Sequence, residues 1–305
     1  MLIPLLVLFS LPAPSFDIKD GDRIVMVGGA LVEREQQFGQ VELLLHMTHK
    51  DKKFTVRNLG WSGDTVWGEA RAGFGTQADG YRTLVEQVKA AKPTLLILGY
   101  GTCEAFAGKP GVEKFEKQYR QLLADIATPE TRCIFLTIPT PVAAKVSPTF
   151  SQAEYDAVIK TLAKERGALL VDLHDVYQPN KNNVTKQQPP KTDDGILPND
   201  LGYQELAGKI ITAVIVAEGR NAAGPPGIVL IPADNPPRDW TPVTKLIKRK
   251  DELYFHQYRP QNNTYLFLFR KHEQGNNAKE IPQFEPLIAE LDKQINEMKG
   301  KLPPK

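Results

Sequence analysis

The chain of 305 residues has few cysteines, almost no net charge and no long hydrophobic run in its interior. Its two cysteines, Cys103 and Cys133, have no partners at metal-ligand spacing, so we expect two free thiols and no cysteine-based metal centre. A formal charge of +2 is too small for the basic surface that nucleic acid requires. These shortages exclude a disulfide-dependent scaffold and argue against a nucleic-acid partner.

The one strongly apolar stretch lies at the N-terminus, and no other stretch is apolar enough to span a bilayer. Residues 1–16 are too short to span one comfortably, and their small-residue end resembles the cleavage zone of a secretory signal. We therefore expect a signal peptide at residues 1–16, no stable membrane span, and a secreted or periplasmic protein. The alternative is an N-terminal strand or an apolar tail that covers the core.

Between residues 20 and 218, short apolar stretches alternate with amphipathic patterns. We expect strands at residues 24–27, 54–59, 94–100, 133–137 and 168–173. Helices are expected at residues 31–46, 80–91, 112–127 and 151–166, with a last one ending near residue 218. Strands that are apolar on both faces are typical of a parallel sheet covered by helices on both sides. The pattern predicts a three-layer α/β/α domain over residues 17–219, with a five-stranded, mainly parallel sheet.

The last part of the chain, residues 220–305, is richer in proline and less regular. We expect a linker, then a short hairpin of strands at residues 253–256 and 265–269, and then a helix at residues 285–299. Polar residues beside aromatics between positions 255 and 277 fit two roles. They line a carbohydrate- or anion-binding cleft, or they tie the tail to the domain through side-chain-to-backbone hydrogen bonds. We favour the second role and predict an irregular C-terminal extension packed on the domain.

Ligands of such sheets bind at the carboxyl ends of the strands, so the segments that follow the strands form the candidate site. The first of these segments is Gly28-Gly29-Ala30, between a buried strand and the start of a helix. A strand-turn-helix junction of this kind is where an α/β sheet presents a nucleophile or anion-binding amides. Glycine and alanine supply no nucleophilic side chain. The sequence thus has a turn without a nucleophile where one is expected.

Four short segments at this edge resemble, in order, the blocks of SGNH (GDSL-type) hydrolases, a flavodoxin-like family of esterases and lipases. Gly28-Gly29-Ala30 corresponds to the block Gly-Asp-Ser, whose serine is the nucleophile. Gly60 follows the second strand, where the family has an oxyanion-hole glycine. Gly101-Thr102-Cys103 corresponds to Gly-x-Asn, and Asp194-Gly195-Ile196-Leu197 to Asp-x-x-His. The resemblance implies the α/β/α sandwich of that family over about residues 20–218. The leader and the tail also resemble secreted GDSL-like proteins of planctomycete-type bacteria.

Three catalytic positions of this resemblance carry residues that cannot perform the chemistry. Ala30, Leu197 and Cys103 stand where the serine, the histidine and the asparagine are expected, whereas Asp194 is retained. Loss of the nucleophile or the base costs about a million-fold in a serine hydrolase, and loss of an oxyanion donor roughly a hundred- to a thousand-fold. We therefore predict a ligand-binding pseudo-hydrolase with no metal or organic cofactor, whose partner is a small-molecule or glycan ester.

The expected ligand site consists of backbone amides instead of a nucleophile. The amides of Gly28 and Gly29, with that of Gly60, would form an anion-accepting pocket. Gly101 and Glu104 lie at the same edge and are further ligand-binding candidates. Elsewhere in the site we interpret two polar residues, Ser62 and Asp64, as hydrogen-bonding groups that fix their loop.

Two other hypotheses remain open. The first is an active carbohydrate or lipid ester hydrolase with displaced residues: Cys103 as nucleophile, His174 as substitute base and Glu104 as a carboxylate. Without a nearby base, however, a thiol stays mostly protonated. The second is a structural or interaction module in which the tail, not the old cleft, matters. The discriminating observation is whether a histidine lies beside Ala30; the histidines considered are His174, His256 and His272.

Overall fold

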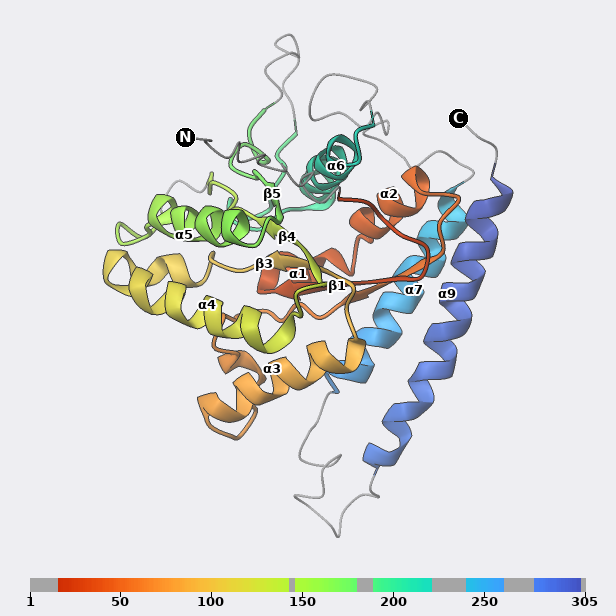
Figure 1. Cartoon of the computed structure of the whole chain (residues 1–305), viewed down its shortest axis with the longest axis horizontal. Helices are drawn as coiled ribbons and strands as arrows, with labels where there is room; N and C mark the ends of the chain where they lie inside the picture. The colour runs from red at the N-terminus through yellow and green to blue at the C-terminus, as the bar shows by residue number, and fades with distance from the viewer. Residues whose placement is uncertain (1–15, 143–145, 180–188, 221–239, 261–276, 303–305) are drawn as a thin grey trace, which may run out of the picture.

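A computed structural model describes residues 16–142, 146–179, 189–220, 240–260 and 277–302, and its centre is one parallel sheet (Figure 1). The strands are β1 (Asp22–Gly28), β2 (Phe54–Asn58), β3 (Leu95–Gly99), β4 (Arg132–Leu136) and β5 (Leu169–Val171). They lie in the order β2-β1-β3-β4-β5, and every neighbouring pair is parallel. The predicted five-stranded parallel sheet is therefore confirmed.

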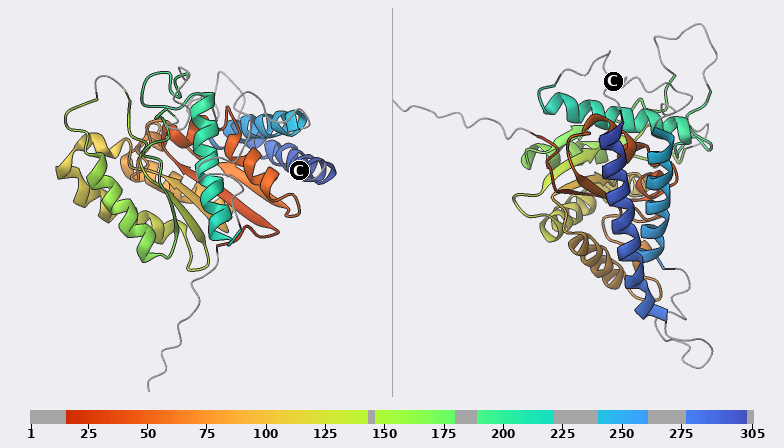
Figure 2. Two further views of the ribbon diagram at one scale, coloured as in Figure 1. Left: turned by 90° about the horizontal axis from the view of Figure 1, so that it is seen from above. Right: turned by 90° about the vertical axis from the view of Figure 1, so that its right-hand side faces the viewer.

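Helices cover both faces of this sheet (Figure 2). The α-helices are α1 (Ala30–Glu35), α2 (Gln40–Thr48), α3 (Gln77–Ala91), α4 (Val112–Ile126), α5 (Gln152–Glu165), α6 (Asp200–Ala217), α7 (Thr241–Tyr258) and α9 (Phe284–Lys301). Short 3-10 helices are η1 (Glu69–Arg71), η2 (Glu104–Ala107), η3 (Lys109–Gly111) and η5 (Asn277–Gln283). Residues of α2 and α6 pack on one face of the sheet, and residues of α3, α4 and α5 pack on the other. This is the expected three-layer sandwich.

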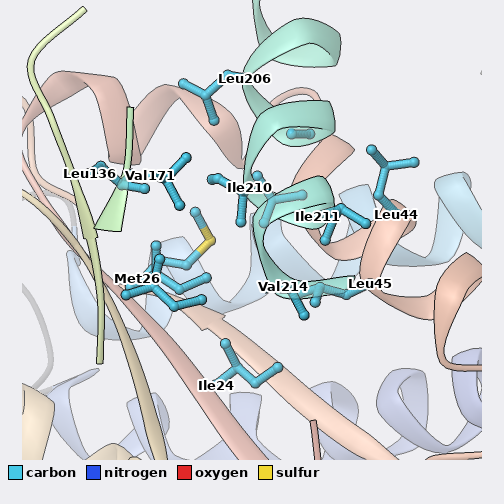
Figure 3. Packing of buried hydrophobic residues seen from close by; sticks show 14 of the residues in the cluster. Ile24, Met26, Leu44, Leu45, Leu136, Val171, Leu206, Ile210, Ile211 and Val214 are labelled. Carbon is cyan, nitrogen blue, oxygen red and sulfur yellow. The ribbon is translucent and has the colours of Figure 1, made fainter. Parts of the chain in front are cut away.

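Alternation along the strands explains why they are apolar throughout. Successive side chains of a strand point to opposite faces, so Ile24 and Met26 of β1 face α2 and α6, whereas Val25 and Val27 face α3 and α4. Figure 3 shows the first of these two cores, in which labelled side chains of β1, β4 and β5 meet those of α6 and α2. These four side chains are each at most 2% exposed. Burial on both faces is what the continuous hydrophobic stretches predicted.

The helix expected over residues 31–46 is instead two helices, which is a correction to the sequence analysis. α1 ends at Glu35 and α2 begins at Gln40, with Gly39 between them at a φ of 66°. A side chain rarely adopts this left-handed conformation, and a Cβ on Gly39 would also lie 2.8 Å from Cγ2 of Ile247. The apolar period continues across the break, because both helices pack on the same core, and so the pattern alone concealed it.

The C-terminal extension contains helix where we expected a strand. Residues 253–256 belong to α7, so the predicted hairpin is wrong in its first half. Val243 and Ile247, four residues apart, and Leu253 are buried, which is helical spacing and outweighs the strand preference of the aromatic residues nearby. The terminal helix expected at residues 285–299 is confirmed as α9. α7 and α9 lie side by side and antiparallel beside the sheet (Figures 1 and 2).

Several predictions concern residues that the structure does not describe. The leader at residues 1–15 and the second strand of the expected hairpin, residues 265–269, lie outside the described residues. Within the described part, both cysteines are free thiols. No helix among the described residues is both long and apolar enough to cross a membrane.

Buried charges join α7 and α9 to the domain. Lys250 of α7 is fully buried, pairs with Glu42 of α2 and with Asp251, and donates to the carbonyl of Val56 at 3.1 Å. Burial raises the pKa of Asp251 to about 7, even though the ammonium opposes the shift. From α9, Asp292 accepts two hydrogen bonds from Arg57 of β2, the edge strand. Because these charges are out of water, each one depends on its partner.

We expect the change Lys250→Met to lower the free energy of unfolding by about 3–5 kcal/mol, because it leaves the carboxylates of Glu42 and Asp251 buried without their cation. The loss should be smaller at pH 5 than at pH 8, since protonation removes the uncompensated charge. Urea unfolding followed by circular dichroism measures both values. The exposed control Lys245→Met, on the same helix, should change stability by no more than about 0.5 kcal/mol. Equal losses in the two variants would contradict this account.

Candidate functional site

A pocket of about 240 Å³ lies at the carboxyl ends of the central strands. It brings together four of the positions that the sequence resemblance singled out, namely Ala30, Cys103, Asp194 and Leu197, but not Gly60. Its other lining residues are Gly29, Leu31, Asp64, Gly99, Tyr100, Gly101, Thr102, Glu104, Phe106 and Ile196. Aliphatic and aromatic groups form much of this wall. The residues that the resemblance assigns to a catalytic site thus meet in a pocket whose lining is largely apolar.

The turn after β1 is set by close packing of backbone. A Cβ on Gly28 would lie 2.4 Å from the carbonyl oxygen of Gly99 on β3 and 2.6 Å from Cγ2 of Val32, so only glycine fits there. Ala30 then begins α1, and the first bonds of the helix run from Val32 and Glu33 to the Gly29 carbonyl, each at 3.0 Å. This geometry directs Ala30 and Leu31 to the pocket.

Two amides that we expected to face a ligand are bonded within the chain. The Gly60 amide donates to Oδ1 of Asn58 at 2.9 Å, and Gly60 is not among the residues that line the pocket. The Gly101 amide donates to Oε2 of Glu104 at 2.8 Å. A donor that already has a protein acceptor is not free for an oxyanion. The expected anion-accepting pocket of Gly28, Gly29 and Gly60 therefore lacks its Gly60 donor, and the separate candidate Gly101 does not offer its amide to a ligand.

Glu104 is a buried carboxylate that joins two loops of the site. It is 4% exposed, and besides Gly101 it accepts the amide of Val66 at 2.9 Å. Burial raises its pKa to about 7, although the two amides favour the charged form. The sequence suggested a ligand-binding carboxylate here. The structure instead shows both oxygens engaged by backbone.

The Cys103 thiol lines the pocket but is poorly suited to nucleophilic attack. Burial, followed by the nearby Glu104 carboxylate, raises its pKa to about 11. At neutral pH almost none of it is then the thiolate, which is the reactive form. No positively charged neighbour lowers this pKa among the described residues. Cys103, which stands where the resemblance expects an asparagine, is therefore a protonated thiol at neutral pH.

His174 does not lie at the pocket. Its Nε2 contacts Oδ2 of Asp156 at 2.6 Å and its Nδ1 lies 3.2 Å from Oδ1 of Asp172. This is the environment of a structural histidine held between carboxylates of α5 and the β5 loop. None of the histidines that the structure describes lines the pocket; the others are His46, His49 and His256. His272 lies outside the described residues.

The last segment of the site is a compact turn organised by Asp194. One of its oxygens accepts the amides of Ile196 at 2.9 Å and Leu197 at 2.7 Å. Although partial burial opposes the shift, these amides lower the pKa of the Asp194 carboxyl. The turn places the Leu197 side chain at the pocket, where the resemblance expects an imidazole. The carboxylate is retained, but its partner is aliphatic.

The loop after β2 is fixed by polar contacts, as we expected for Ser62 and Asp64. Ser62 donates to Glu33 of α1 through its amide and its hydroxyl. Asp64 accepts from Nε of Arg71 at 2.7 Å, in a pair with no exposed side-chain surface. The sequence analysis did not anticipate Glu33 or Arg71. The signal available was charge on segments that are otherwise packed, Glu33 within an apolar helix start and Arg71 beside a glycine-rich loop.

Within the described ranges, no three His, Cys, Asp or Glu side chains converge as a metal site would require. Glu104 and Asp194 accept backbone amides, whereas Oδ1 of Asp64 is buried at the pocket without a hydrogen-bond partner in the part of the chain that the structure describes.

The change Glu104→Gln should flatten part of the pH dependence of stability. The folded protein binds this proton more tightly than the unfolded chain, with a pKa of about 7 instead of 4.5. The stabilisation that follows is complete below pH 4.5 and is lost as the pH rises to about 7. The difference in unfolding free energy between wild type and variant should thus fall by about 3 kcal/mol over that range. Urea titrations at each pH measure it, with the exposed Glu113→Gln as control; a constant difference would refute the assignment.

Comparisons with known proteins agree with this geometry. A model of the GDSL-like lipase/acylhydrolase family matches residues 27–205, which is more than half of the chain. A gut microbial diltiazem-metabolizing enzyme has a similar structure, with 12% identity and a TM-score of 0.58 over 94% of this chain and 97% of its own. A variant of Axe2, an acetyl-xylooligosaccharide esterase from Geobacillus stearothermophilus, shares 21% identity and a TM-score of 0.51 over 68% of this chain and 99% of its own.

At these identities the solved structures support a common fold, and among curated proteins no sequence matches the chain. The family match covers the segments from the first turn to the start of α6, and so includes every wall of the pocket. The chain belongs to the GDSL-like lipase/acylhydrolase family.

Proposed function

We propose that this chain is a non-catalytic, ligand-binding member of its family. The observation that carries the proposal is that Ala30 and Leu197 line one pocket together with Asp194. Acyl transfer by a serine hydrolase needs a nucleophile and an imidazole, and these two side chains supply neither. The third altered position, Cys103, contributes a thiol that stays protonated at neutral pH. A pocket with an intact shape and no reactive group suits recognition of a ligand without turnover.

The size and lining of the pocket support a short acyl group as the ligand part that enters it. Sites for drug-sized ligands usually measure roughly 300–1,000 Å³, whereas this pocket holds about 240 Å³. Phe106 lines it, is 40% exposed and packs against Phe150 with the ring centroids 4.9 Å apart and the planes tilted by 56°, giving an apolar rim. One protein of similar fold is an acetyl-xylooligosaccharide esterase. We therefore propose an acetylated carbohydrate, with its acetyl group in the pocket and its sugar at the rim.

One observation favours a second function, hydrolysis by a water molecule that Glu104 activates. This carboxylate lines the pocket and has a pKa of about 7, which is suitable for a general base. However, each of its oxygens already accepts a backbone amide. To act as a base, the Glu104 carboxylate would have to take a proton from water in competition with those hydrogen bonds. We therefore rank this function below binding and make it an outcome of the tests.

Purified wild-type protein should not hydrolyse 4-nitrophenyl acetate above the buffer rate. The double variant Ala30→Ser, Leu197→His should gain hydrolysis at least tenfold above wild type, because it restores a nucleophile and an imidazole beside Asp194. Ala30→Ser alone is the control and should stay near background, since a serine without a base is a weak nucleophile. Wild-type turnover that disappears in Glu104→Gln or Cys103→Ala would instead establish the active hydrolase.

Acetylated xylotriose should bind the wild-type protein at least tenfold more tightly than deacetylated xylotriose in isothermal titration calorimetry. Ala30→Phe should abolish this preference, because the ring fills the pocket. The same substitution at the exposed position Ala78, on α3, should leave binding unchanged. Thermal unfolding of both variants checks that they fold. Equal affinity for the two sugars would contradict the acyl pocket, and no binding of either would favour an interaction module.

A further inference from the structure

The last turn of α7 contacts the loop after β2, which contributes Asp64 to the wall of the pocket. The hydroxyl of Tyr258 donates to the carbonyl of Gly60 at 2.6 Å. In return, Gln87 of α3 donates to the carbonyl of Tyr258 at 2.8 Å. That carbonyl belongs to the end of a helix, where it has no partner within the helix itself. The extension and the domain thus satisfy each other's backbone groups at this point.

Trp61, which follows Gly60, is the next contact. Two guanidinium groups lie over its ring, that of Arg71 at 5.2 Å and that of Arg259 at 4.6 Å from the centroid. Cation–π contacts of this kind contribute about 0.5–2 kcal/mol each, depending on how far they are desolvated. Arg71 also binds Asp64, a pocket residue. The ring therefore connects the extension to the pocket wall through side chains on both sides of the loop.

Glu33 is where the three elements meet. It lies in the first turn of α1, next to the pocket residues Ala30 and Leu31. Its carboxylate accepts the amide and hydroxyl of Ser62 and pairs with Arg259, which follows α7. Its side chain is 12% exposed and that of Arg259 is 28% exposed, so water screens the pair only partly. One carboxylate thus fixes α1, the loop and the extension relative to one another.

We infer that the last turn of α7 holds the pocket wall in place, so that docking of the α7–α9 pair and occupation of the pocket are thermodynamically coupled through Arg259 and Glu33. A change that weakens docking of the α7–α9 pair lowers the affinity for the ligand. Bound ligand in turn favours docking of the pair by the same factor. Arg259 is a positioning residue here, because it touches the wall and not the pocket interior. Only the ligand half of the inference rests on the proposed function.

Hydrogen exchange of the full chain tests the structural half. In Arg259→Met, amides of residues 60–66 should exchange at least tenfold faster than in wild type, above all the amide of Ser62, whose acceptor Glu33 loses its cation. Arg259→Lys keeps the charge and should restore part of the protection. The matched control is Arg249→Met, which removes an exposed arginine from α7 and should leave the loop unchanged. Unchanged exchange in Arg259→Met would overturn the inference.

Binding of acetylated xylotriose tests the ligand half. We expect an affinity at least fivefold lower in Arg259→Met and unchanged in Arg249→Met. In wild type, saturating sugar should slow exchange in the last turn of α7 by a similar factor. A faster loop with unchanged affinity and unchanged α7 exchange would refute the coupling. If wild type does not bind the sugar, the proposed function fails. Faster loop exchange in Arg259→Met would then still show that α7 stabilises the pocket wall.

Discussion

The structure depends on how closely the backbone of β1 approaches that of β3. Gly28 and Gly99 are register partners, and a Cβ on either would collide with Cγ2 of Val32 at 2.6 Å. Because these two positions lack side chains, α1 packs directly on the ends of β1 and β3. A methyl group of Val32 fills the space that remains. This contact sets where α1 starts, and hence where Ala30 and Leu31 lie. The glycines at positions 28 and 99 therefore determine where this side of the pocket lies.

In the non-catalytic role that we propose, the carboxylates of the site serve to fix its loops. Catalysis by electrostatic stabilisation requires donors that are fixed in place and still unpaired when the transition state forms. Here the carboxylates of Glu33, Glu104 and Asp194 each accept amides from the loops. These bonds fix the loops relative to one another and occupy the amides that make them. Amides engaged in this way are not available to stabilise new charge.

Much of the fold could be predicted from the sequence because its signals are local. Continuous apolar stretches separated by helical patterns identify a parallel sheet wherever they occur. The four segments at its carboxyl edge could also be placed, since each directly follows a strand or precedes a helix. Cys103 and Leu197 do lie in one pocket with Ala30, as the resemblance implied.

The remainder depends on contacts between residues distant in the chain. Glu33 and Arg259 pair across 226 positions of the chain, and no local sequence pattern predicts that they meet. The strand expected at residues 253–256 failed for a similar reason, because Val243 and Ile247 pack into a core that only the folded domain provides. The amides of Gly60 and Gly101 bond to the side chains of Asn58 and Glu104, which are near in sequence. The loop geometry nevertheless decides which amide each side chain accepts.

The position of Lys250 has a consequence for β2. An edge strand exposes unpaired backbone groups, and these are a template on which a strand of another molecule can add. In β2 the carbonyl of Val56 accepts from the Lys250 ammonium, and that of Phe54 accepts from the Asn296 side chain, each at 3.1 Å. A charged group and a helix pair therefore occupy the place that an added strand would need. The extension thus blocks the addition of another strand along this edge of the sheet.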